Sequence, residues 1–132
     1  QQHSNTVSLF KKAEELGVEY VLAKEIQSAN IESILERLDQ YLYQCRDVYV
    51  TVCTDVFSSA FAPGVSAPQS LGLDPEVMLP LLKHVLRTRK VRGFDICEIS
   101  PRFDQDNTTA NLGAVIIFAV VNTLCRLSGL AL

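Results

Sequence analysis

The stretch that decides the fold reads VTVCTDVF over residues 50–57 and continues as APGVSAP over residues 62–68. Its first part is rich in β-branched residues, which favour strands, and it ends in an acidic side chain, Asp55. A loop stiffened by proline and glycine follows at once. In open α/β sheets, ligands collect at the carboxyl ends of the strands. The stretch therefore predicts a buried strand that places Asp55 at the edge of the sheet where ligands bind.

A second stretch ends in the same way. The sequence GFDICEISP over residues 93–101 is again apolar and places Glu98 shortly before Pro101. Because the carboxyl ends of parallel strands meet at one edge of a sheet, two acidic strand ends in a small chain predict one site. We expect the side chains of Asp55 and Glu98 to open into a common crevice there.

Helical and strand patterns alternate along the whole chain. We expect four helices, over residues 4–16, 28–44, 74–88 and 104–127. We expect three strands, over residues 18–23, 47–55 and 91–99. This order is typical of parallel strands with helices on both faces of the sheet, and it predicts a three-layer α/β/α fold.

Local signals support several of these boundaries. The expected caps are Ser4 or Asn5 for the first helix, Ser28 or Asn30 for the second, and Asp104 for the last. Asp74 is placed to cap the third helix with Pro75 at its first position, and Gly17 is placed to close the first helix. The apolar run 112–121 is too short to span a bilayer and predicts a buried helix. A sheet of three strands is too narrow to bury this apolar helix. We therefore expect residues 1–132 to be the C-terminal part of a larger single domain.

Composition excludes several classes of partner. The 132 residues carry a net charge of −3 and the pI is near 5.3, so there is no electrostatic footprint for nucleic acid. The basic residues between 83 and 92 are typical of the polar face and C-terminal end of a helix. No membrane-binding segment is expected. The four cysteines, which show no CxxC spacing, indicate reduced thiols and a cytoplasmic protein.

Each candidate site residue also has a purely structural interpretation. Asp55 could cap the loop that follows it, and Cys53 could be a packed strand thiol. Glu98 could form an ion pair with Arg92 or Arg102.

Taken together, these motifs resemble the ureohydrolase superfamily, which contains arginase, agmatinase and formimidoylglutamase. Cys53-x-Asp55 with FAPGVSAP over 61–68 resembles the third signature of that family, and FDICEISP over 94–101 resembles its closing strand. The helix over 4–17 resembles one upstream of the third signature. The motif APGVSAP is more similar to the corresponding loop of formimidoylglutamases than to that of arginases or agmatinases. The resemblance covers essentially the whole chain and implies an arginase-like three-layer fold.

The resemblance also implies roles for individual residues. In the family, the third signature supplies two aspartates, spaced as D-x-D, to a pair of Mn²⁺ ions. Asp55 matches the second of these metal ligands, whereas Cys53 stands in the position of the first. A thiolate is a softer ligand than a carboxylate and prefers zinc or copper(I) to manganese. Glu98 matches the carboxylate that binds the cationic amidine group of the substrate.

The activity implied by the resemblance is manganese-dependent hydrolysis of N-formimidoyl-L-glutamate to L-glutamate and formamide, in histidine degradation. A metal-bridging hydroxide would attack the amidine carbon. The remaining metal ligands and the proton-relay histidine are expected upstream of this chain, so we expect no catalytic residue within it and no activity of the 132 residues alone. Family members commonly form homo-oligomers.

Three alternatives stay open. The departure at Cys53 is consistent with a catalytically inactive homologue that has a structural or regulatory role. An arginase-type or agmatinase-type guanidino hydrolase is a second alternative. A third is an independent small α/β module that uses Asp55 and Glu98 for binding alone.

Overall fold

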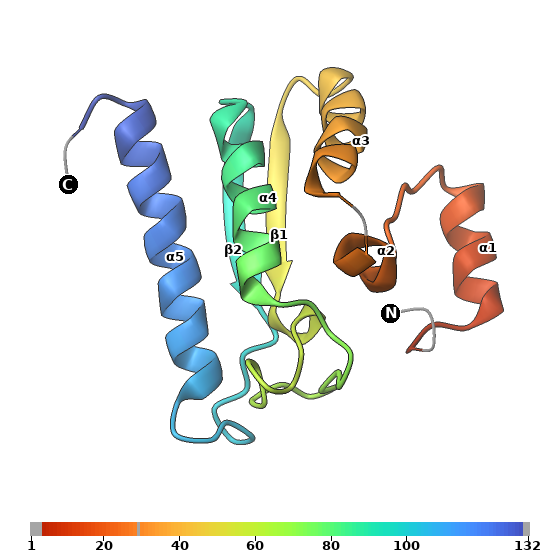
Figure 1. Cartoon of the computed structure of the whole chain (residues 1–132), viewed down its shortest axis with the longest axis vertical. Helices are drawn as coiled ribbons and strands as arrows, with labels where there is room; N and C mark the ends of the chain where they lie inside the picture. Colours follow the sequence, from red (N-terminus) through yellow and green to blue (C-terminus); the bar gives the residue numbers. More distant parts are fainter. Residues whose placement is uncertain (1–3, 29, 131–132) are drawn as a thin grey trace.

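The structure is a computed structural model that describes residues 4–28 and 30–130. Its helices are α1 (Val7–Glu15), α2 (Ala23–Ser28), α3 (Ile31–Tyr43), the short 3₁₀ helix η2 (Thr54–Val56), α4 (Pro75–Arg87) and α5 (Thr108–Leu127). Its strands are β1 (Val48–Cys53) and β2 (Val91–Cys97). In Figure 1, α1 to α3 lie on the β1 side of the sheet and α5 lies on the β2 side.

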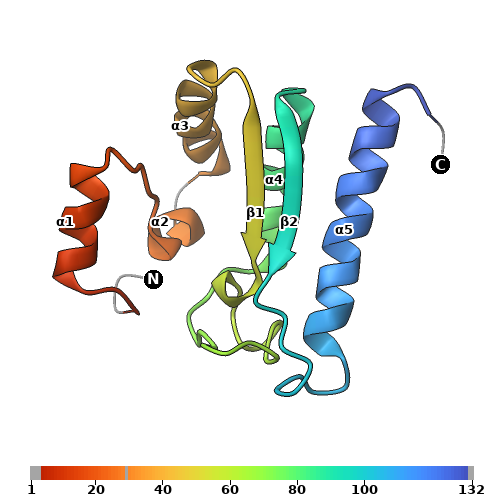
Figure 2. The same cartoon turned by 180° about the vertical axis from the view of Figure 1, so that it is seen from behind.

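The two strands form a parallel sheet, and both run toward the same end of the molecule (Figure 2). Their register pairs Val50 with Phe94, Val52 with Ile96, and Cys53 with Cys97. Since side chains alternate along a strand, the pairs Val50–Phe94 and Val52–Ile96 share one face and the cysteines share the other. The last paired residues of both strands are therefore the two cysteines.

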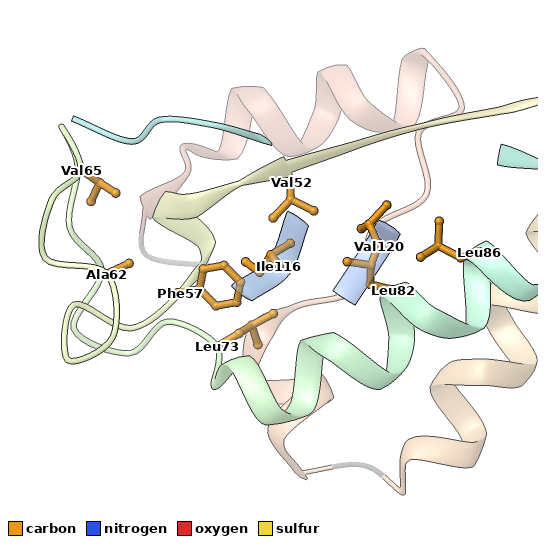
Figure 3. Packing of buried hydrophobic residues seen from close by; sticks show 9 residues of the cluster. All are labelled: Val52, Phe57, Ala62, Val65, Leu73, Leu82, Leu86, Ile116 and Val120. Carbon is orange, nitrogen blue, oxygen red and sulfur yellow. The ribbon is translucent and has the colours of Figure 1, made fainter. Parts of the chain in front are cut away.

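The hydrophobic core lies on the face that carries Val52. Figure 3 shows Val52 directed toward residues of α5, with α4 and the loop after β1 closing the cluster. The buried members of the cluster are Val52, Phe57, Ala62, Val65, Leu73, Leu82, Leu86, Ile116 and Val120. Burial of apolar side chains stabilises such a core by about 25 cal/mol per Å². This packing fixes the β1 end and the following loop against α4 and α5.

Capping explains where two helices begin. The carboxylate of Asp74 accepts a hydrogen bond of 2.7 Å from the backbone N–H of Glu76, and Pro75 occupies the first helical position. Asn30 caps α3 in the same way by accepting from the N–H of Glu32 at 3.2 Å. The predicted starts of both helices are confirmed.

Helix α5 is longer than the apolar run within it. It has 20 residues and, by length and composition alone, it is the one helix in the described part of the chain that could cross a membrane. Its face with Gly113, Ile116 and Val120 is buried against the rest of the fold. Its other side leaves Val115 and Phe118 54% and 63% exposed. The predicted burial is thus only partly observed.

The predicted strand over residues 18–23 is wrong. Residues 18–22 adopt no regular structure, and Ala23 already begins α2. A strand exists only where it pairs, and the described sheet contains β1 and β2 alone. The side chain of Tyr20 instead packs against Phe10, with ring centroids 5.3 Å apart. The β-rich composition of this segment therefore does not by itself produce a strand.

Three further boundaries differ from the prediction. The N-cap of α1 is Thr6, which makes no side-chain capping hydrogen bond, rather than Ser4 or Asn5. Strand β1 ends at Cys53, so Asp55 lies in η2 and not in the strand. Strand β2 ends at Cys97, two residues before the predicted end. Gly17 closes α1 with a positive φ of 65°, as predicted.

Candidate active site

The site is built on the paired ends of the two strands. Cys53 and Cys97 are register partners, and the next residue after Cys53, Thr54, is fully buried. Its hydroxyl donates a hydrogen bond of 2.9 Å to the carbonyl oxygen of Cys97. This bond ties η2 to the end of β2. Asp55 and Glu98 therefore lie at the same edge of the sheet, as the sequence predicted.

A cavity of about 460 Å³ opens beside the end of β1. Its polar lining includes Cys53 and Asp55, together with Ser4, Asn5 and Gln69. Its apolar lining residues are Val21, Ala23, Ile26, Val56, Ala67 and Leu73. Glu98 does not line this cavity. Asp55 and Glu98 therefore share one edge of the sheet, as predicted, but they do not both open into this cavity.

Cys53 and Asp55 contact each other through their side chains. Burial raises the pKa of the Cys53 thiol to about 12, and hydrogen bonding to the Asp55 carboxylate and to the Cys97 thiol adds to the rise. The thiol of Cys53 is consequently neutral at pH 7. Asp55 lies in η2, the 3₁₀ turn that follows Cys53, and lines the same cavity as Cys53.

These residues do not fit the pair of Mn²⁺ ions that the family resemblance implies. Mn²⁺ prefers carboxylate oxygens, and at this position the chain offers one carboxylate and one sulfur, which is a softer donor. Among residues 4–28 and 30–130, no group of three or more His, Cys, Asp or Glu side chains is arranged to hold a metal ion. Any metal at Asp55 would need further ligands from outside this chain.

Glu98 is exposed and adopts an unusual backbone conformation. Its φ is +64°, in the left-handed region that residues other than glycine rarely adopt. Its carboxylate accepts a hydrogen bond of 2.9 Å from the hydroxyl of Ser66, in the loop after β1. Strain of this kind persists where the surrounding structure holds it, and it is common at functional sites.

The alternative roles of the two carboxylates find no support in the contacts. Arg92 pairs with Asp47 at 2.7 Å, and the guanidinium of Arg102 lies over the ring of Phe103. Within the described residues, neither arginine forms an ion pair with Glu98. Likewise, no backbone N–H of the described loop donates to Asp55. Among the described residues, the ion pairs of Glu98 with Arg92 or Arg102 that the sequence left open are therefore not observed.

Gly64 joins the loop after β1 to the segment after β2. Its N–H donates to the buried hydroxyl of Thr109 at 2.7 Å, and its carbonyl accepts from the N–H of Ser100 at 2.8 Å. A Cβ at Gly64 would lie 2.5 Å from the Cβ of Asp104. Only glycine allows this approach, which places Ser66 opposite Glu98.

Helix α5 begins at Thr108, with Asn107 at the N-cap position, rather than at residue 104. Asp104 nevertheless supplies capping hydrogen bonds to its first turn, as the sequence predicted. Its carboxylate accepts from the backbone N–H groups of Thr109 and Ala110, each at 3.0 Å. Burial acts to raise the pKa of Asp104, but these hydrogen bonds outweigh it and hold the pKa below its ordinary value. The cap therefore favours the ionised carboxylate.

Sequence reasoning missed three contacts of the site. Ser66 contacts Glu98, Thr54 joins the strand ends, and the hydroxyl of Ser4 donates to the side-chain oxygen of Gln69 at 2.7 Å. These pairs are separated by 32, 43 and 65 residues. No local pattern signals such contacts, although the APGVSAP motif contains Ser66.

A sequence model of the Arginase family matches residues 2–122. The chain belongs to the arginase family. Over all 132 residues it is 55% identical to a formimidoylglutamase of Clostridium tetani (strain Massachusetts / E88), of which it covers 39%. It is 42% identical to a formimidoylglutamase of Legionella pneumophila (strain Paris), over 93% of this chain and 39% of that protein. The arginase-family chain thus spans about two-fifths of the length of these relatives.

A solved structure supports the fold independently. The formimidoylglutamase of Bacillus subtilis superposes with a TM-score of 0.85 over 92% of this chain and 38% of that chain. The two sequences are 20% identical over this region, so this likeness shows the fold alone. The fold is the arginase-like three-layer α/β/α fold, and the predicted resemblance to the superfamily is confirmed.

Proposed function

We propose that this chain forms part of the active site of a metal-dependent hydrolase that cleaves a C–N bond of a linear amidine. The proposed substrate is N-formimidoyl-L-glutamate, which with one water molecule gives L-glutamate and formamide. The observation that carries the proposal is the register pair Cys53–Cys97, because it brings Asp55 and Glu98 to one edge of the sheet. The names of the relatives from C. tetani and L. pneumophila support the choice of substrate.

Glu98 has the chemistry to bind the reacting group. A protonated amidine is a planar cation with several N–H donors, and a carboxylate is the acceptor that suits it best. The hydroxyl of Ser66 donates to one carboxylate oxygen, Oε2, and thereby orients the group. The other oxygen, Oε1, is then available to the substrate. Asp55, on the β1 side, would act as a metal ligand.

The rest of the site must come from elsewhere in the protein. We propose that the chain is the C-terminal part of one larger α/β domain, consistent with the exposed apolar side chains of α5 and with the length of the relatives. The remaining metal ligands and the proton-relay histidine would lie outside these residues, and the chain alone would be inactive. We also propose a cytoplasmic homo-oligomer of histidine degradation; the four free cysteines agree with a reducing compartment.

The test is an assay of formamide release by the intact polypeptide that contains this chain. The metal-depleted protein is supplied in turn with Mn²⁺, Zn²⁺ or Co²⁺ and with N-formimidoyl-L-glutamate. Glu98→Gln should lower kcat/KM at least about 30-fold, because the lost charge–charge contact is worth about 2 kcal/mol or more. Glu76→Gln, an exposed change in the first turn of α4, is the matched control. Absence of turnover with every metal would refute the proposal.

One observation favours a second function. The thiol of Cys53, which is hydrogen-bonded to Asp55, occupies the position at which the family has a metal-binding carboxylate. A catalytically inactive homologue with a structural or regulatory role would tolerate this change. Such a protein would release no formamide, and Cys53→Asp would restore metal binding.

A further inference from the structure

The carboxylate of Glu98 has one hydrogen-bond donor within the described part of the chain. The hydroxyl of Ser66 donates to its Oε2 atom at 2.9 Å. Among residues 4–28 and 30–130, no other side chain forms a hydrogen bond or an ion pair with this carboxylate, and Arg92 and Arg102 are engaged elsewhere. The Oε1 atom and the negative charge of the group are therefore left for a ligand.

The backbone holds Ser66 opposite Glu98. Two residues before Ser66, the carbonyl oxygen of Gly64 accepts from the N–H of Ser100, which lies two residues after Glu98. Val65, between Gly64 and Ser66, belongs to the buried hydrophobic cluster (Figure 3). The fold itself thus positions the Ser66 hydroxyl at the carboxylate.

An amidine and a guanidine differ in the number of donors that they offer to a carboxylate. A protonated guanidino group ends in two NH₂ groups, whereas a protonated formimidoyl group ends in one NH₂ group and one C–H. A carboxylate that faces both ends of a guanidino group accepts one strong hydrogen bond on each oxygen. Against a formimidoyl group, one of these oxygens would face the C–H and lack a donor, which weakens binding.

We propose that Ser66 is a specificity-determining residue, which makes the Glu98 carboxylate selective for amidines with a single terminal NH₂ group over guanidines. Ser66 supplies to Oε2 the donor that the formimidoyl group lacks, and Oε1 accepts from the NH₂ group of the substrate. A guanidine has to compete with the Ser66 hydroxyl for Oε2, so it gains less from its second NH₂ group. A site whose polar groups match one ligand discriminates against analogues that do not match them. The inference rests on the proposed function, because Glu98 must be the group that receives the amidine.

The test compares two substrates on the intact, metal-loaded polypeptide. N-Formimidoyl-L-glutamate is assayed by formamide release. Its guanidino analogue, N-carbamimidoyl-L-glutamate, has an NH₂ group in place of the C–H hydrogen and is assayed by urea release. Ser66→Ala should lower the ratio of the two kcat/KM values, formimidoyl over guanidino, at least about tenfold, because it removes a donor that only the formimidoyl complex needs. Ser66→Thr keeps the hydroxyl and should keep the ratio.

Ser70→Ala is the matched control. Ser70 is exposed in the same loop, and within the described residues its hydroxyl forms no hydrogen bond. Its backbone carbonyl, which accepts from the hydroxyl of Ser58, is kept in the variant. The ratio should not change. General damage to the loop lowers turnover of both substrates together, so a change in the ratio separates selectivity from a purely structural role.

Dissociation constants of the two compounds, measured by calorimetry on the same variants, separate this inference from the proposed function. Formamide release by the parent protein with an unchanged ratio in Ser66→Ala would overturn the role of Ser66 and keep the hydrolase. A tenfold loss of preference in the dissociation constants of Ser66→Ala, without turnover under any metal, would keep the role of Ser66 and refute the hydrolase. Unchanged dissociation constants without any turnover would overturn both.

Discussion

The buried hydroxyl of Thr54 donates to the carbonyl oxygen of Cys97 and so locks the turn after β1 to the end of β2. The two carboxylates of the site come directly after this contact in the sequence: Asp55 follows Thr54, and Glu98 follows Cys97. The backbone ladder stops at the cysteine pair, so a side chain has to continue the connection. Thr54 is thus the residue that holds the two carboxylates at one edge.

We predict that Thr54→Val destabilises the intact polypeptide by about 1–3 kcal/mol, because it leaves the part-buried carbonyl of Cys97 without its donor while it preserves side-chain volume. Denaturant unfolding measures the effect. Thr51→Val is the matched control, since Thr51 is exposed on the same strand and bonds Asp95 at 3.3 Å. Equal losses from both changes would contradict a special role for Thr54.

Sequence patterns located most of the fold because its elements carry strong local signals. Helix α4 begins with an Asp cap followed by proline, and β1 and β2 are apolar runs that end before polar turns. The segment 18–22 has the composition of a strand but has no partner within the described residues. Pairing is a property of the whole domain, and composition alone cannot supply it.

The site was predictable only in part. Asp55 and Glu98 could be found because they follow apolar strands, and Cys53 could be found from its place in a motif. Their partners could not: the contact between Ser66 and Glu98 depends on how the loop after β1 folds back. That path depends on the close approach of Gly64 to Asp104, which has no signature in the local sequence.

We predict that Gly64→Ala destabilises the intact polypeptide by about 1–3 kcal/mol and lowers activity, because the new methyl group would overlap the Cβ and backbone of Asp104. Unfolding curves and the formamide assay measure both effects. Gly113→Ala is the control: its methyl group would meet the ends of the Ile99 and Ile96 side chains rather than backbone, and alanine favours the helix interior. A larger loss at Gly113 than at Gly64 would be inconsistent with this packing.

The cap at Asp104 predicts a dependence of stability on pH. The pKa of Asp104 is held below its ordinary value of 3.8 in the folded protein, so the unfolded chain binds more protons near that pH. The contribution of the cap is therefore complete above about pH 4–5 and is lost as the pH falls through the folded-state pKa. The difference in unfolding free energy between the parent protein and Asp104→Asn should shrink over this range. A constant difference from pH 7 down to pH 3 would argue against an ionised cap.

The backbone of Glu98 predicts a conflict between stability and function. Its φ of +64° costs a residue with a Cβ about 1 kcal/mol, and glycine adopts this conformation without that cost. Glu98→Gly should therefore unfold at higher denaturant concentration than Glu98→Ala, by about 1 kcal/mol, while both lose the carboxylate and the formamide-releasing activity. Asp106→Gly is the matched control, because Asp106 is exposed, has a φ of 50° and lies in the segment before α5. It should gain stability and keep activity. If Glu98→Gly were no more stable than Glu98→Ala, the left-handed backbone at Glu98 would carry no strain. The proposed conflict between stability and function at this residue would then be wrong.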